Sequence, residues 1–86
     1  MIQWDLDVWE DYLYWQAQDK KMLKRINQLV KDIGRNPFEG IGKPEPRKGN
    51  LSGFWSRRIN GEYRLVYAAA DSTVVVIIAC RGHYSD

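Results

Sequence analysis

The fold is decided by residues 54–68, which read FWSRRINGEYRLVYA. The Asn60-Gly61 pair at their centre is a strong signal for a two-residue β-hairpin turn, because asparagine and glycine tolerate the positive φ that such a turn demands. Aromatic and β-branched residues, which favour strands, lie on both sides of this pair. We therefore predict strands over 54–59 and 62–68, joined by a two-residue turn.

A two-residue turn also fixes the register of the hairpin, and with it the face on which each side chain lies. The predicted pairs are Ile59 with Glu62, Arg57 with Arg64, and Trp55 with Val66. The other face then carries Phe54, Ser56 and Arg58 together with Tyr63, Leu65 and Tyr67. This second face has the greater apolar mass, so we expect it to meet the helices.

The first face would place two arginines directly opposite each other. Such a pair is repulsive unless an anion lies between the two side chains. We therefore expect Arg57, Glu62 and Arg64 to face outward as a surface for a phosphate group. A β-bulge would instead bring Arg58 beside Arg64, and the sequence leaves both arrangements open.

Two helices are predicted before the hairpin. Asp5 or Asp7 can cap the first helix, which runs to about Gln18, and Asp19 can cap a second helix that ends at Gly34. The second helix has an apolar stripe at helical spacing, with lysines and arginines on its other faces. The stripe consists of Met22, Ile26, Leu29, Val30 and Ile33.

The remaining segments complete an α+β domain. Residues 2–4 read as a short first strand, 36–53 as a long loop with three prolines and four glycines, and 73–80 as a buried central strand. The predicted order is β-α-α-β-β-β, a small antiparallel sheet with an N-terminal helical hairpin packed on one face. The 86 residues should form one domain, 1–86.

The composition of the sequence argues against disulfide-bonded, membrane-spanning and secreted proteins. Cys80 is the one cysteine, which excludes an internal disulfide, and its apolar surroundings in the sequence predict a packing role in the core. No apolar run approaches the roughly 18 residues of a membrane span. Residues 1–5 lack the basic and apolar regions of a secretion signal. We therefore expect a cytoplasmic protein without membrane contact.

The net charge of +2 is unevenly distributed. Residues 43–64 hold six basic and two acidic side chains, which gives +4, while the rest of the chain sums to −2. The charged residues of this segment are Lys43, Glu45, Arg47, Lys48, Arg57, Arg58, Glu62 and Arg64. Such a concentration indicates an anion-binding face, although an ordinary solvated surface would account for it equally well.

Acid–base chemistry without a metal is the reaction type that these residues support. The sequence has one histidine, one cysteine and no acidic cluster, so we expect no metal site and no cofactor. RNA carries its own nucleophile, the 2′-hydroxyl, and its cleavage needs a base, an acid and cations for the phosphate. Glu45 is the candidate base, His83 the candidate acid and Arg64 the candidate phosphate clamp. Supporting roles fall to Lys48, to Arg57 or Arg58, and to Tyr84.

Several longer runs carry a more specific signal. Residues 37–59 contain PFEG, GKPEP and NLSGFWSRRI, residues 64–67 read RLVY, and residues 79–84 read ACRGHY. Together with DYLYWQ at 11–16, these motifs resemble the YoeB/Txe family of bacterial toxins, in the RelE/ParE superfamily, over nearly the whole chain. The chain departs from many members of that family by extending two residues beyond its last tyrosine.

The resemblance implies an endoribonuclease of RelE-like fold that enters the ribosomal A site and cuts mRNA there. It places the general base on Glu45, the phosphate-binding arginine on Arg64 and the general acid on His83. It places the supporting residues on Lys48, Arg58, Glu62 and Tyr84. A YefM-type antitoxin would neutralise the toxin, and operator DNA would be bound only through that complex. The resemblance is also compatible with a homodimer.

Two other classes of protein remain open. A ParE-like gyrase poison would share the fold but would bind a protein and lack RNA cleavage, and the Glu45 and His83 pair argues against it. A non-catalytic RNA-binding module would keep the basic face without needing Glu45.

Overall fold

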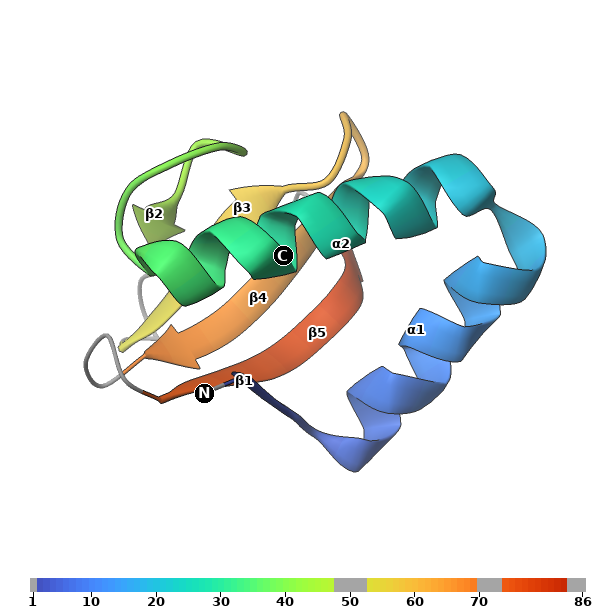
Figure 1. Ribbon diagram of the computed structural model, residues 1–86, viewed down its shortest axis with the longest axis horizontal. Helices are drawn as coiled ribbons and strands as arrows, with labels where there is room; N and C mark the ends of the chain where they lie inside the picture. Colours follow the sequence, from blue (N-terminus) through green and yellow to red (C-terminus); the bar gives the residue numbers. More distant parts are fainter. Residues whose placement is uncertain (1, 48–52, 70–73, 84–86) are drawn as a thin grey trace.

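The computed structural model describes residues 2–47, 53–69 and 74–83. Within these residues the helices are α1 (Leu6–Gln18) and α2 (Lys20–Arg35). The strands are β1 (Ile2–Trp4), β2 (Glu45–Pro46), β3 (Phe54–Arg58), β4 (Tyr63–Ala69) and β5 (Val75–His83). They form one sheet in the order β1-β5-β4-β3-β2 (Figure 1).

The α+β class and the helical pair are confirmed, and the sheet is mixed rather than wholly antiparallel. β1 runs parallel to β5, with Ile2 opposite Val75, whereas the other strand pairs are antiparallel. β2 is an additional edge strand within the segment predicted as a loop. β5 continues past the predicted end at residue 80, so that the backbone of His83 belongs to the strand.

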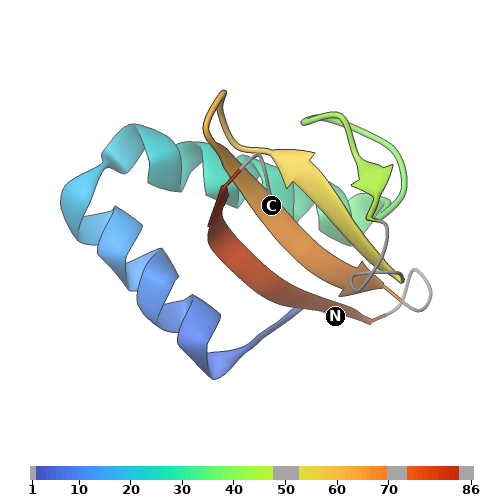
Figure 2. The ribbon, with the colours of Figure 1, turned by 180° about the vertical axis from the view of Figure 1, so that it is seen from behind.

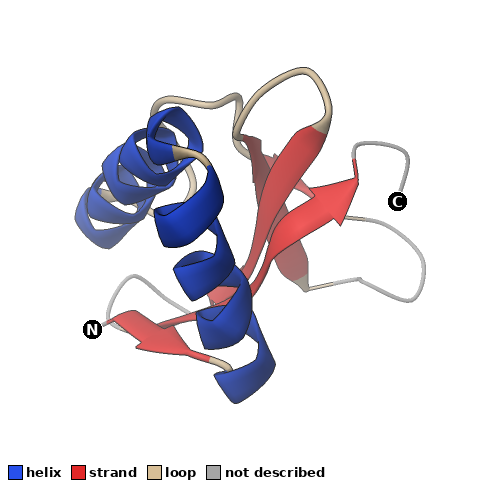
Figure 3. Cartoon of the chain, turned by 90° about the vertical axis from the view of Figure 1, so that its right-hand side faces the viewer, coloured by secondary structure: helices blue, strands red, loops and turns tan. Residues whose placement is uncertain are grey.

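The helices cover only one face of the sheet. In Figure 3 both helices lie on the same side of the strands, and in Figure 1 α2 crosses in front of β3 and β4. Seen from behind, β3, β4 and β5 face the viewer with no helix across them (Figure 2). We call this second side of the sheet the open face.

Both helices begin at aspartates, as the sequence predicted. The Asp5 carboxylate accepts a hydrogen bond from the Asp7 N–H at 3.0 Å, so Asp5 rather than Asp7 caps α1. Oδ1 of Asp19 accepts from the N–H groups of Lys21 and Met22 at 3.1 and 3.2 Å. These bonds satisfy N–H groups that lack a partner in the first helical turn, and a negative charge there also suits the helix dipole.

The core lies between the helices and the sheet. α2 contributes Met22, Ile26, Leu29 and Ile33, and the sheet side contributes Ile59, Leu65, Tyr67, Val75, Ile77 and Cys80. Trp15 ties α1 to β5, because its Nε1 donates to the carbonyl of Cys80 at 3.0 Å. Neither helix among the described residues is long and apolar enough to cross a membrane.

The hairpin turn differs from the predicted one. Residues 60–62 form a three-residue loop, closed by a bond of 3.0 Å from the Ile59 N–H to the Tyr63 carbonyl. Within the loop, Oδ1 of Asn60 accepts bonds from the N–H groups of Glu62 and Tyr63, both at 2.8 Å. The asparagine side chain thus takes the place of a backbone turn. The predicted pairing of Ile59 with Glu62 is wrong.

The extra loop residue shifts the register by one position and exchanges the faces of β3 relative to β4. Arg58, not Arg57, lies opposite Arg64, and Arg57 lies opposite Leu65. Leu65 faces the helices as predicted, but Arg57 shares that side with it, and the predicted outward position of Arg57 is wrong. Ser56 and Arg58 lie with Arg64 on the open face.

The burial of Cys80 leads to an expectation for its chemistry. The thiol is fully buried, and burial raises its pKa to about 12, so very little thiolate exists near neutral pH. Alkylation needs the thiolate and access to the reagent. We expect iodoacetamide to label the native protein at least about a hundredfold more slowly than the urea-unfolded protein at the same pH, as followed by mass spectrometry. Equal rates in the two states would contradict this placement.

Candidate active site

Three strands bring polar side chains together on the open face. Arg64 of β4 donates from Nη1 to Oε1 of Glu45 at 2.6 Å and to Oγ of Ser56 at 2.9 Å. The Arg64 side chain is 6% exposed, whereas the Glu45 side chain is 56% exposed. The guanidinium is therefore held within the sheet surface, and the carboxylate stands at its edge within reach of a ligand from solvent.

The strand register accounts for this arrangement. Glu45 lies opposite Ser56 in the β2–β3 pair, and Arg64 lies opposite Arg58 in the β3–β4 pair. Ser56 and Arg58 are two residues apart on one strand, so their side chains share a face. The Arg64 side chain therefore runs diagonally across β3 to reach Ser56 and Glu45.

β5 forms the other border of the site. Gly82 lies opposite Arg64 in the β4–β5 pair, and His83 lies opposite Tyr63. The backbone of His83 is thus one register position from Arg64, but its side chain lies outside the described part of the structure. Lys48 and Tyr84 lie outside it entirely. The roles predicted for His83, Lys48 and Tyr84 stay predictions.

Arg57 is not part of this face. It is fully buried, and all five of its N–H donors are used inside the protein. Nε donates to Oη of Tyr67 (3.1 Å), Nη1 to Oδ2 of Asp32 (2.6 Å) and the Ile41 carbonyl (3.1 Å), and Nη2 to the carbonyls of Asn36 (2.7 Å) and Glu39 (3.2 Å). No N–H group is left for a phosphate. Arg58, opposite Arg64, takes the position that we expected for Arg57.

Glu62 lies at the exposed tip of the 60–62 loop, where its N–H donates to Asn60. The carboxylate that contacts Arg64 is that of Glu45. The sequence had placed Glu62 beside Arg64 on one outward face, and the three-residue loop removes the pairing on which that expectation depended.

Sequence reasoning missed Ser56 and Asp32. Ser56 is fully buried, and its hydroxyl holds the Arg64 guanidinium. The alternation of side chains along β3 would have placed it with Arg58, but only the true register brings it to Arg64. Asp32 is one of many polar residues of α2, and the fold alone brings it to Arg57, 25 residues further along the chain.

Two groups bonded to Arg57 have shifted pKa values. The hydrogen bond from Arg57 lowers the pKa of Asp32, and the Ile41 N–H and the charge of Arg35 act in the same direction, while burial opposes them. Burial raises the pKa of Tyr67 above that of an ordinary phenol, and the bond from Arg57 opposes it. At neutral pH this cluster therefore consists of a carboxylate, a guanidinium cation and a neutral phenol.

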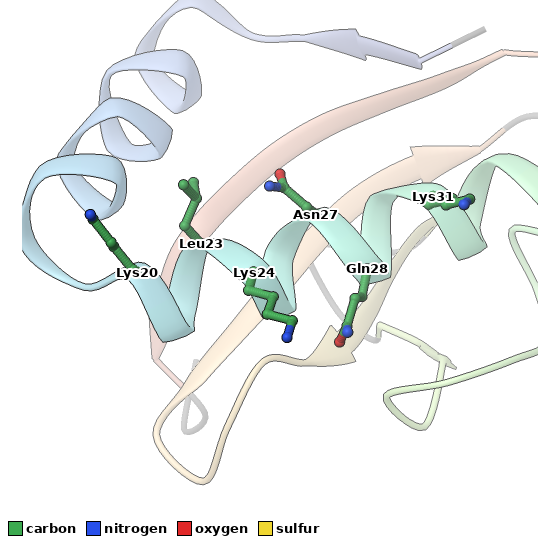
Figure 4. Close-up of a pocket in the computed structure, with 6 residues that line it drawn as sticks. All are labelled: Lys20, Leu23, Lys24, Asn27, Gln28 and Lys31. Carbon is green, nitrogen blue, oxygen red and sulfur yellow. The ribbon is translucent and has the colours of Figure 1, made fainter.

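A separate groove of about 350 Å³ lies on the outer surface of α2 (Figure 4). It is lined by Lys20, Leu23, Lys24, Asn27, Gln28 and Lys31. These residues recur at helical spacing and include neither a carboxylate nor an imidazole, so the groove offers no acid–base pair. Across the described ranges, no three His, Cys, Asp or Glu side chains come together as metal ligands.

Comparison with known proteins places the chain in a class and then in a family. The sequence model described as "YoeB-like toxin of bacterial type II toxin-antitoxin system" matches residues 4–84. With the two-layer fold and the Glu45–Arg64 face, this match defines a toxin of a bacterial type II toxin–antitoxin system. Within that class, the chain belongs to the YoeB-like toxin family.

Its relatives match almost the entire chain. Toxin YoeB of Escherichia coli K12 is 62% identical over 81 residues, which are 94% of this chain and 95% of that protein. A YoeB/ParE toxin from Agrobacterium tumefaciens has a TM-score of 0.89 at 45% identity, covering 96% of this chain and 98% of that one. YoeB in the YoeB–YefM complex from Staphylococcus aureus has a TM-score of 0.86 at 50% identity, covering 98% and 97%. The Staphylococcus aureus YoeB dimer has a TM-score of 0.86 at 52% identity, covering 96% and 95%.

The Asp32–Arg57 pair should make stability depend on pH. The pKa of Asp32 is lowered in the folded protein, so the ionised pair stabilises the fold above the ordinary carboxyl pKa of about 4. This contribution is lost as the pH falls through the lower, folded-state pKa. In urea titrations, we expect the difference in free energy of unfolding between wild type and Asp32→Asn to be constant above about pH 5 and to shrink below about pH 4.

Asp11→Asn is the matched control for this experiment. It removes a carboxylate from an ion pair with Arg81 (3.3 Å) in which both side chains are more than a third exposed. An Asp32→Asn difference that stays constant down to about pH 2.5 would contradict the stabilising role of the ionised Asp32.

Proposed function

We propose that this toxin is a ribosome-dependent endoribonuclease that cuts mRNA in the ribosomal A site by general acid–base catalysis. The observation that carries the proposal is the contact of 2.6 Å between Nη1 of Arg64 and Oε1 of Glu45 on the open face. It supports the proposal because RNA cleavage needs a base and a phosphate-binding cation within reach of one nucleotide. The 86 residues act as a single toxin domain.

In the proposed reaction, Arg64 binds a non-bridging oxygen of the scissile phosphate, and Glu45 takes the proton of the 2′-hydroxyl. The freed oxygen attacks the adjacent phosphorus, and the bond from phosphorus to the 5′-oxygen breaks. His83 gives its proton to the departing oxygen. The products are a 2′,3′-cyclic phosphate and a 5′-hydroxyl, and the RNA itself supplies the nucleophile.

The register of the hairpin supports the phosphate-binding role. Arg58 lies directly opposite Arg64 in the β3–β4 pair, so the two side chains emerge next to each other on the open face. In the proposed site, a phosphate bound beside Arg64 is also within reach of a second cationic side chain, that of Arg58. Lys48, Glu62 and Tyr84 complete the proposed substrate site.

The partners are proposed from the relatives. The Staphylococcus aureus YoeB has been solved with YefM and also as a dimer. We therefore propose that a YefM-type antitoxin binds this chain, that operator DNA is reached only through that complex, and that the toxin can form a homodimer. The basic 43–64 segment is the proposed surface for an acidic segment of the antitoxin. A ribosomal target also places the protein in the cytoplasm.

Cleavage on purified ribosomes tests the proposed catalytic residues. With a defined codon in the A site, we expect Glu45→Gln, Arg64→Ala and His83→Ala each to lower the rate at least about a hundredfold, because each removes a proton-transfer or charge-stabilising group. Primer extension locates the cut, and circular dichroism checks that each variant is folded. Glu10→Gln, which removes an exposed carboxylate of α1, is the control and should cut like wild type.

The same series separates the rival classes. Equal cutting by wild type and His83→Ala would contradict the proposal that His83 is the general acid. Growth arrest without new mRNA 5′ ends would favour a gyrase-poison activity. Ribosome binding without any cleavage would favour a non-catalytic RNA-binding module.

A further inference from the structure

The buried Arg57 is bonded to the chain segment that leads to Glu45. Its guanidinium donates to the carbonyls of Asn36, Glu39 and Ile41, so it binds the 36–42 segment at three points. Oδ2 of Asp32, which accepts from Arg57, also accepts from the Ile41 N–H at 3.0 Å. The Asp32 carboxylate and the Arg57 guanidinium thus both bind the backbone of this segment.

Two glycines show how closely the segment is fitted to this pair. Gly40 has φ 137°, and a Cβ atom there would lie 1.8 Å from Oδ2 of Asp32. Gly42 has φ 80°, and its Cβ would lie 2.6 Å from Cδ2 of Leu29. A side chain at either position would be strained in the backbone and would collide with its surroundings. The 36–42 segment is therefore packed closely against Asp32 at Gly40, and against Leu29 and Arg57 at Gly42.

Glu45 follows this segment after only two intervening residues. The Gly42 carbonyl accepts from the Arg58 N–H at 2.6 Å, and beyond β2 the Arg47 N–H donates to the Phe54 carbonyl at 2.8 Å. β2 itself is two residues long, and one of them, Pro46, has no N–H to donate. The position of Glu45 thus depends on the anchored backbone at each end of β2 more than on strand pairing within it.

We propose that the Asp32–Arg57 pair positions Glu45. From the opposite face of the sheet, the pair holds the Glu45 carboxylate in contact with Arg64. Neither Asp32 nor Arg57 touches the substrate in this scheme. Loss of the pair releases the 36–42 segment, displaces β2 and breaks the contact between Glu45 and Arg64, while Arg64 stays on its central strand. The effect on catalysis rests on the proposed function, whereas the effect on the Glu45–Arg64 contact does not.

A purely structural role and a positioning role for the Asp32–Arg57 pair predict different experimental results. If Asp32 and Arg57 only stabilise the fold, a variant that is still folded keeps the Glu45–Arg64 contact and cuts RNA at the wild-type rate. If they position Glu45, the folded variant loses the Glu45–Arg64 contact and cuts RNA more slowly than wild type. Asp32→Asn is the mild variant, because asparagine keeps the shape of the side chain and one acceptor oxygen. Arg57→Lys keeps the charge but cannot reproduce five donors in a fixed fork.

The first experiment does not depend on activity. In ¹⁵N- and ¹³C-labelled folded protein, NMR of the Arg64 guanidinium and the Glu45 carboxyl carbon reports their contact. In Asp32→Asn and Arg57→Lys, we expect the Arg64 guanidinium signal to shift towards its position in Glu45→Gln, and the Glu45 carboxyl signal to shift towards its position in Arg64→Lys. Hydrogen exchange at the Ile41 amide should become faster in both variants. Asp11→Asn should change none of these signals. Unchanged Glu45 and Arg64 signals in folded Asp32→Asn would overturn the proposal.

The second experiment is a double-mutant cycle on ribosomal cleavage under single-turnover conditions. We expect Asp32→Asn to slow cleavage about ten- to a hundredfold in the wild-type background, as expected for a misplaced catalytic group. The same change should have almost no effect in a Glu45→Gln background and its full effect in a His83→Gln background. An equal effect in all three backgrounds would mean a general structural role and would overturn the proposal. If wild type does not cut RNA, the proposed function fails, and the NMR result still decides the positioning role.

Discussion

The rest of the structure depends on the hydrogen bonds of the buried Arg57 guanidinium. It is excluded from solvent and bonded to a carboxylate, a phenol and three backbone carbonyls. Removing a cation from water costs on the order of several kcal/mol, so it is tolerated only where every donor is satisfied. Since the partners come from α2, β4 and the 36–42 segment, these elements must meet at one point. The geometry of the segment before Glu45 follows from that requirement.

The turn at 60–62 decides which arginine takes which role. Arg57 and Arg58 are adjacent, so alternation along β3 sends one towards the helices and the other to the open face. The three-residue loop, organised by the Asn60 side chain, aligns Arg58 with Arg64. A two-residue loop would put Arg57 opposite Arg64 and bring Arg58 to the side of Asp32. A single residue in the turn therefore decides which arginine is buried in the structure and which lies on the open face.

Much of the fold was predictable because it rests on local signals. The aspartate caps, the apolar stripe of α2, the hairpin and the buried last strand all appear in the sequence as patterns a few residues long. The register was not predictable, because it depends on a side chain, that of Asn60, competing with the backbone for hydrogen bonds. β2 and the Asp32–Arg57 pair were missed for a related reason: each joins residues far apart in the sequence. Of the candidate site, Glu45 and Arg64 were predicted together, while Ser56 required the true register.

The two central residues of the proposed site are held in different ways, and the difference follows from what each must do. A phosphate clamp acts best when it is fixed before the substrate arrives, and Arg64 is 6% exposed, between β3 and β5 and against Ser56. A base must reach a hydroxyl that comes from solvent, so Glu45 is 56% exposed on a two-residue edge strand. A two-residue edge strand that contains proline has few N–H groups with which to pair. The rigidity that the base needs must then come from elsewhere, and the contacts of Arg57 supply it from the buried side of the sheet.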